Sequence, residues 1–78
     1  MHIVIAKVDE VLFEGEAYSL TVPATAGEMT VLGHHEPLIT TLKAGEVRVH
    51  LNVGDTPKTF SISTGVLEVR SDGATVIL

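Results

Sequence analysis

Cysteine and tryptophan are both absent from the 78 residues of the chain. Without cysteine the chain has neither disulfides nor thiolate metal ligands, which favours a reducing compartment. A domain of this length buries only roughly 60–65% of the surface that its unfolded chain exposes. We therefore expect a thin hydrophobic core without disulfides, in a domain whose stability comes from the sheet core or partly from a partner.

Basic residues are also scarce, since five lysines and arginines stand against ten acidic residues and give a net charge of −5. Phosphate binding needs a basic patch, so this balance argues against nucleic acid and against an anionic membrane surface. No apolar run approaches the ~20 residues of a membrane-spanning helix, and the N-terminus does not resemble a signal peptide. We expect a soluble intracellular protein with one domain, residues 1–78.

Aromatic residues number only two phenylalanines and one tyrosine, although 45% of the chain is hydrophobic. The apolar mass lies in valine, leucine and isoleucine, and β-branched residues favour strands. Turn signals recur about every eight to twelve residues, the spacing of sandwiches and barrels. The pattern predicts an all-β fold in which residues 38–42 form either a strand or a single helical turn.

The clearest strand pattern covers residues 46–53, where every second residue is apolar: Val47, Val49, Leu51 and Val53. This period of two predicts one buried and one solvent-facing side. We expect Pro23 to end the strand at 16–22, because proline cannot donate to a ladder. We expect Gly15 to mark a bend or a bulge.

His34 and His35 are the only residues that suggest site chemistry at first sight. Adjacent side chains in extended backbone point to opposite faces, so the pair is poorly placed to chelate one ion. A zinc site would need further ligands from His2, His50 or carboxylates. In the alternative interpretation, one histidine hydrogen-bonds within the loop and the other is exposed.

Catalytic motifs are missing. Serine, histidine and aspartate are present, but no serine lies in a nucleophile-elbow pattern, and no glycine-rich loop precedes a helix that could bind phosphate. The carboxylates at Asp9-Glu10 and at Glu14 and Glu16 fit solvated turn charges. The sequence predicts neither an enzyme nor a cofactor.

The segment from Gly27 to Pro37 is the best candidate for recognition, because loops on a rigid scaffold often carry binding residues. It contains Met29, Leu32 and both adjacent histidines between glycine and proline. An ordinary connecting loop, with its apolar residues in the core, explains the same composition equally well.

Several motifs occur in a characteristic order along the chain. They are Val11-Leu12-Phe13-Glu14-Gly15-Glu16, Val22-Pro23 before Gly27-Glu28, His35 with Pro37-Leu38, Leu42-Lys43 with Gly45, and Gly65-Val66-Leu67-Glu68-Val69 with Val76. This order and spacing resembles the epsilon subunit of bacterial F-type ATP synthase. The resemblance runs from about Ile3 to Leu78.

The resemblance implies a two-sheet antiparallel β-sandwich of roughly ten short strands, the N-terminal domain of that subunit. It also implies a non-catalytic rotor subunit of the central stalk that binds the gamma subunit and the c-ring. Such a subunit helps to couple proton translocation to ATP synthesis. It would associate with the cytoplasmic face of the membrane only indirectly, through the complex.

By the same resemblance, Gly27, Glu28 and Met29 would face the c-ring, with Glu28 directed toward its basic loops. The segment with His35, Pro37 and Thr40 would face gamma.

Three departures from the family pattern affect this region. The family often has leucine-glycine or phenylalanine-glycine in place of Met29-Thr30, and proline-glycine in place of Gly33-His34. It usually has alanine in place of Glu36.

Family members normally continue into a pair of C-terminal helices that carry autoinhibition and nucleotide sensing, whereas this chain stops at Leu78. We expect it to lack both properties. An alternative of a different class is a free-standing β-sandwich that binds a ligand or metal through His34 and His35. That alternative predicts a concave pocket with converging polar groups around these histidines.

Overall fold

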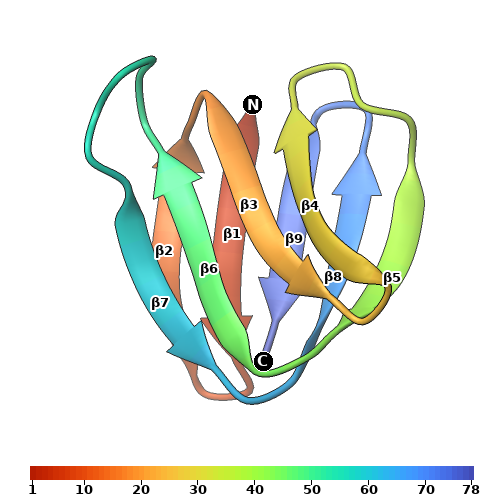
Figure 1. The fold of residues 1–78 in the computed structure, drawn as a ribbon. Helices are drawn as coiled ribbons and strands as arrows, with labels where there is room; N and C mark the ends of the chain where they lie inside the picture. The colour runs from red at the N-terminus through yellow and green to blue at the C-terminus, as the bar shows by residue number, and fades with distance from the viewer.

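The computed structural model describes all 78 residues and contains nine strands and no helix (Figure 1). The strands are β1 (His2–Lys7), β2 (Glu10–Glu16), β3 (Ser19–Ala24), β4 (Gly27–Leu32), β5 (Leu38–Leu42), β6 (Gly45–His50), β7 (Lys58–Ile62), β8 (Gly65–Arg70) and β9 (Gly73–Ile77). Residues 38–42, which the sequence left open, form a strand. No helix of the length and apolar character needed to cross a membrane is present.

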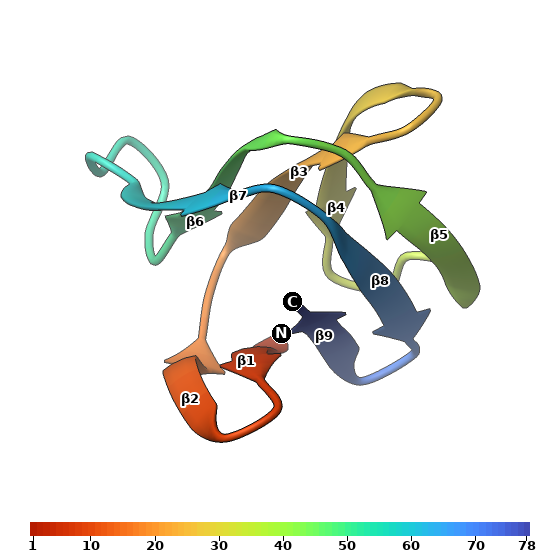
Figure 2. The same cartoon turned by 90° about the horizontal axis from the view of Figure 1, so that it is seen from below.

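The strands form two layers that curl around a common interior (Figure 2). One layer has the order β7-β6-β3-β4 and the other β5-β8-β9-β1-β2. They are joined between β3 and β5 by the single residue pair Ala24–Leu42. The predicted all-β sandwich is confirmed, with two differences in detail: there are nine strands, and β1 runs parallel to β9.

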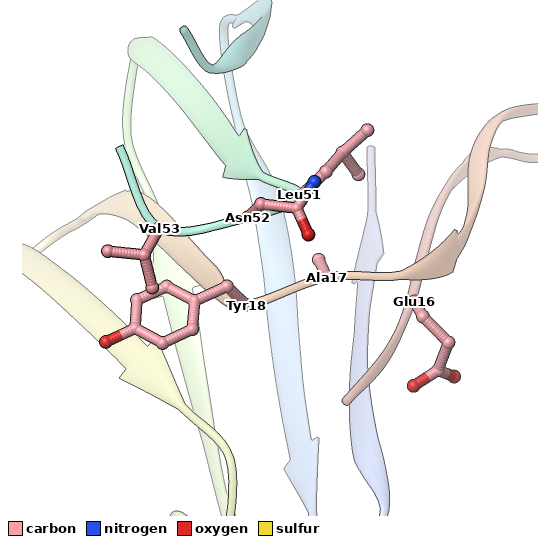
Figure 3. Close-up of a pocket in the computed structure, with 6 residues that line it drawn as sticks. All are labelled: Glu16, Ala17, Tyr18, Leu51, Asn52 and Val53. Carbon is pink, nitrogen blue, oxygen red and sulfur yellow. The ribbon is translucent and has the colours of Figure 1, made fainter. Parts of the chain in front are cut away.

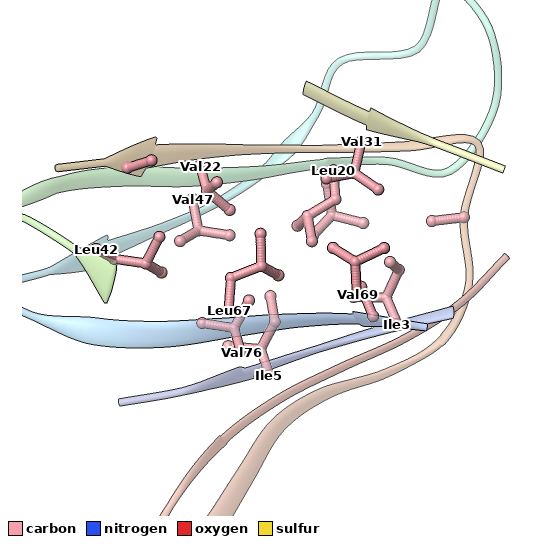
Figure 4. Packing of buried hydrophobic residues seen from close by; sticks show 14 residues of the cluster. Ile3, Ile5, Leu20, Val22, Val31, Leu42, Val47, Leu67, Val69 and Val76 are labelled. Atoms are coloured by element: carbon pink, nitrogen blue, oxygen red, sulfur yellow. The ribbon is translucent and has the colours of Figure 1, made fainter. Parts of the chain in front are cut away.

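The core is a cluster of 14 buried hydrophobic residues, all of them aliphatic, that face each other from the two layers (Figure 4). Val22 and Val47 from one layer lie opposite Leu67 and Val76 from the other. The two phenylalanines pack at the side of the sandwich instead, where the Phe13 and Phe60 ring centroids are 6.4 Å apart. The contact joins β2 to β7, the last strands of the two layers, and closes that side of the sandwich.

The strand predicted for residues 46–53 is shorter than its pattern indicated. Val47 and Val49 are fully buried as expected, but β6 ends at His50, and Leu51 and Val53 are 37% and 72% exposed. The chain turns away after the last ladder pair with β3. Leu51 and Val53 therefore lie outside the sheet, at the end of the sandwich.

Neither Pro23 nor Gly15 interrupts a strand as predicted. Pro23 lies within β3, because its missing N–H would point to the side where pairing with β6 has already ended; its carbonyl accepts a hydrogen bond from the Lys43 N–H at 2.9 Å. Gly15 pairs regularly with Ile3. The ladder of β1 and β2 shifts instead at Leu12, the extra residue of a β-bulge.

The parallel pair of β1 and β9 depends on a close approach of the two backbones at Gly73. A Cβ atom built on this buried glycine would collide with the carbonyl oxygen of His2. We predict that Gly73→Ala lowers the free energy of unfolding by roughly 1–3 kcal/mol, the usual cost of overpacking. Urea unfolding followed by circular dichroism measures this change.

The matched control is Gly33→Ala, because a Cβ atom at Gly33 meets no atom within 4 Å. Its effect on the free energy of unfolding is expected to stay within about 0.5 kcal/mol. Equal midpoints for the two variants would show that the parallel junction tolerates a side chain.

Candidate protein interface

The residues predicted to face the c-ring lie at the tip of one hairpin. β3 and β4 are joined by the turn residues Thr25 and Ala26, and Gly27 begins β4 in the left-handed region with φ 137°. A residue with a Cβ atom rarely adopts this conformation, which explains the glycine. Met29 points inward and packs against the core, so Glu28 alone of the three directs a side chain to the outer face.

Glu28 is engaged in an ion pair within the chain. The Arg48 Nη2 atom on β6 donates to Glu28 Oε2 at 2.8 Å across β3. Both side chains remain in contact with solvent, with exposures of 34% for Arg48 and 63% for Glu28. The pair positions the carboxylate on the outer face of its layer, and a basic side chain from a partner could compete for it.

We predict that Glu28→Gln changes the free energy of unfolding by less than about 1 kcal/mol, because exposed ion pairs contribute little. Glu46→Gln on β6 is the control, since Glu46 is exposed and forms no ion pair. Chemical denaturation of both variants measures the difference. A loss above about 2 kcal/mol for Glu28→Gln alone would contradict a weak pair and give Glu28 a structural role.

His35 and Pro37 lie at the opposite end of β4, in the connection to β5 (Figure 1). His34 adopts a left-handed conformation with φ 65°, and the His35 Nδ1 atom lies 2.8 Å from the Glu36 carbonyl oxygen, to which it donates. Thr40 on β5 is half-buried beside Leu67. His35 and Pro37 are therefore separated from the Gly27–Met29 group by the length of β4. Thr40 instead lies next to Thr41, whose hydroxyl group is hydrogen-bonded at 2.9 Å to that of Thr25 in the β3–β4 turn.

The structure does not support the alternative of a ligand or metal module at the histidine loop. No group of three metal-ligating side chains occurs. One hollow of about 490 Å³ lies at the end of the sandwich, with Tyr18 and Val53 on one side and Glu16 on the other (Figure 3). A second, of about 430 Å³, lies beside the β1–β2 turn. Neither hollow is lined by a histidine.

A row of apolar side chains crosses the outer face of the layer that contains β8, β9, β1 and β2. The ladder registers place Val66 beside Ile77, Ile77 beside Ala6, and Ala6 beside Val11. Val66, Ile77 and Val11 are 41%, 50% and 58% exposed. We call these four residues the apolar row. It is continuous only because β1 and β9 pair in parallel, which the sequence did not reveal.

The outer face of the other layer is polar by comparison. Its central row consists of Thr59, Arg48, Thr21 and Thr30, and the hydroxyl groups of Thr21 and Thr30 are hydrogen-bonded at 2.9 Å. Exposed apolar residues that are contiguous mark interaction sites more often than isolated ones. The two outer faces are therefore suited to different surroundings, and the apolar row is the stronger candidate for contact with a protein.

The chain matches, over residues 1–78, a family model described as the ATP synthase delta/epsilon chain, beta-sandwich domain. It is 34% identical over 77 residues to the ATP synthase epsilon chain of Delftia acidovorans, covering 99% of this chain and 55% of that one. The epsilon chain of Alkalilimnicola ehrlichii is 35% identical over 77 residues, with 99% and 54% covered. The chain thus spans about half the length of these relatives.

Two solved structures are similar in fold. A chain of the Euglena gracilis mitochondrial ATP synthase, solved as OSCP/F1/c-ring, superposes with a TM-score of 0.86 at 25% identity, covering 96% of this chain and 48% of that chain. A chain from the central stalk and c-ring of the Tetrahymena thermophila mitochondrial ATP synthase gives a TM-score of 0.79 at 13% identity, with 99% and 61% covered. The second likeness concerns the fold alone.

Proposed function

The chain belongs to the ATP synthase delta/epsilon family, whose β-sandwich domain it matches over residues 1–78, and on this premise we propose that it is a non-catalytic rotor subunit of an F-type ATP synthase. In this role it binds the gamma subunit and the c-ring as one β-sandwich domain. It helps to couple proton translocation to ATP synthesis. It works at the cytoplasmic face of the membrane, which it reaches only through the complex.

The observation that carries the proposal is the match to epsilon chains along 99% of this chain. A fold alone would not define a function, because β-sandwiches host many. Here the sequence likeness and the superposition on the Euglena chain at 25% identity agree over nearly all residues. The relatives are about twice as long, and the proposal concerns only the half that this chain matches.

Gamma binds, in this proposal, to the outer face that carries the apolar row. On β5 the row meets Thr41, which is paired with Val66, and Ile39 is 72% exposed on the same face beside Glu68. Pro37 directly precedes β5, so the predicted gamma-facing segment with His35 and Pro37 borders this surface. Burial of such apolar area is the main favourable contribution in protein association.

The c-ring binds at the β3–β4 hairpin, where Glu28 offers a carboxylate on the rim of the contact. A charged group at a wet rim contributes mainly to orientation and to the rate of encounter. The chain carries a net charge of −5, which adds to the attraction of basic loops on a partner.

Ile77→Lys is predicted to weaken the binding of gamma from the same organism about tenfold or more, because a lysine in the apolar row would lose hydration without gaining a partner. Thr59→Lys on the polar outer face is the matched control and is expected to stay within about twofold. Co-elution by size exclusion, followed by isothermal titration, measures the dissociation constants. Failure of the unaltered chain to bind gamma would overturn the proposed function.

Glu28→Lys is predicted to reduce the retention of the chain and gamma on purified c-ring about threefold to tenfold, since the substitution reverses a rim charge. Glu46→Lys provides a control with the same change in net charge on the same layer. The difference should shrink as salt is raised, because exposed charges are screened. Equal retention of both variants at low salt would remove Glu28 from the c-ring contact.

A further inference from the structure

Three strands of the sandwich are paired on one side only. β2 and β7 are the first and last strands of the continuous strand order that runs through both layers, and β4 pairs with β3 alone. An unpaired strand edge presents a row of N–H and C=O groups that can accept another strand, and soluble proteins usually block such edges. The three edges differ in how well they are blocked.

The edges of β2 and β7 are protected. β2 carries a β-bulge at Leu12 and three glutamates, Glu10, Glu14 and Glu16. β7 follows directly after Pro57 and begins with Lys58. The contact of Phe13 with Phe60 also brings these two edges together at one side of the sandwich. Bulges, charges and prolines of this kind prevent pairing with a further strand.

β4 has none of these features. It pairs with β3 without a shift from Gly27 to Leu32, and it contains no proline and no lysine. Its one charge, on Glu28, is drawn back over its own layer by Arg48 at 2.8 Å. On its other side, no pairing joins β4 to β5. The edge is therefore regular, and its outward charge is already neutralised.

The orientation of the free backbone groups follows from Pro23. Its carbonyl oxygen accepts from the Lys43 N–H at 2.9 Å, on the side away from β4. Pro23 pairs with Glu28, and in an antiparallel ladder both members of a pair point their polar groups the same way, either toward or away from each other. The N–H and C=O groups of Glu28, and by alternation those of Thr30 and Leu32, therefore point away from β3.

We propose that the edge of β4 binds an extended segment of gamma by strand addition, with backbone hydrogen bonds to Glu28, Thr30 and Leu32. This inference rests on the proposed function. Strand addition supplies affinity through the main chain and specificity through alternate side chains. Residues of the added strand that point inward would cover Met29 and Leu38, which pack only partly buried against the core. Apolar residues suit those positions, and polar residues suit the outer positions beside Glu28 and Thr30.

Gamma fits this edge better than a second copy of the chain does. β4 ends at the connection with His35 and Pro37, the segment proposed to face gamma, so a gamma segment that contacts this connection can continue along the β4 edge. Two copies would bring together net charges of −5 each, which opposes association.

Amide hydrogen exchange tests the proposal directly. In the free chain the amides of Glu28, Thr30 and Leu32 should exchange fast, whereas those of Met29 and Val31 should be protected by β3. Addition of gamma should slow exchange at the three edge amides about tenfold or more. Unchanged fast exchange of these amides in a formed complex would overturn the inference and leave the proposed function intact.

Protection that appears in the chain alone as its concentration is raised would identify a second copy as the occupant, and would overturn the assignment to gamma. No complex with gamma at all would instead remove the proposed function.

A pair of variants at Thr30 provides a second test. Thr30→Pro removes an edge N–H that no strand of this chain uses, and an edge strand tolerates proline. Thr30→Val keeps this N–H and loses only the hydroxyl group that bonds to Thr21. We expect Thr30→Pro to weaken gamma binding about tenfold relative to Thr30→Val. Equal dissociation constants for the two folded variants would contradict strand addition.

Discussion

The packing of small aliphatic side chains between two layers is the interaction on which the rest of the molecule depends. None of the 14 buried hydrophobic residues is aromatic, so no single side chain fills much of the interior. Each strand must contribute residues at alternate positions, because a strand points successive side chains to opposite faces. The other alternate positions of each strand point to the outer faces. There the two layers differ, since one outer face is polar and the other carries the apolar row.

The two sides of the sandwich are held differently. At one side Phe13 and Phe60 join the last strands of both layers. At the other, β3 passes from pairing with β6 to a single pair with β5, between Ala24 and Leu42. Pro23 lies at this transition, where a missing N–H costs no hydrogen bond. The layers are thus closed by side chains at one side and by backbone at the other, and β4, which pairs with β3 alone, keeps a free edge beside the backbone junction.

The sequence predicted features that depend on neighbouring residues, such as the buried face of a strand. It did not predict features that depend on the pairing of strands distant in sequence. The alternation of Val47 and Val49 identified the buried face of β6 correctly, and the order of motifs identified the family. The same alternation continues to Val53, yet the sheet ends at His50 because its partner β3 begins at Ser19. The apolar row was not predicted, because Ile77 and Ala6 become neighbours only through the parallel pairing of β1 and β9.

Met29-Thr30 is one of the places where the sequence departs from the pattern of the family that it resembles, and the structure shows the conformation that these residues adopt. Thr30 stands on the outer face of β4, where its hydroxyl group bonds to Thr21 at 2.9 Å. A β-branched residue favours an extended strand, whereas a glycine in a strand interior weakens it. Thr30 therefore favours an extended, hydrogen-bonded strand along the edge between the hairpin and the histidine connection. A rigid edge loses less conformational entropy when a partner binds along it, so this chain is better preorganised for such contact than one with glycine at position 30.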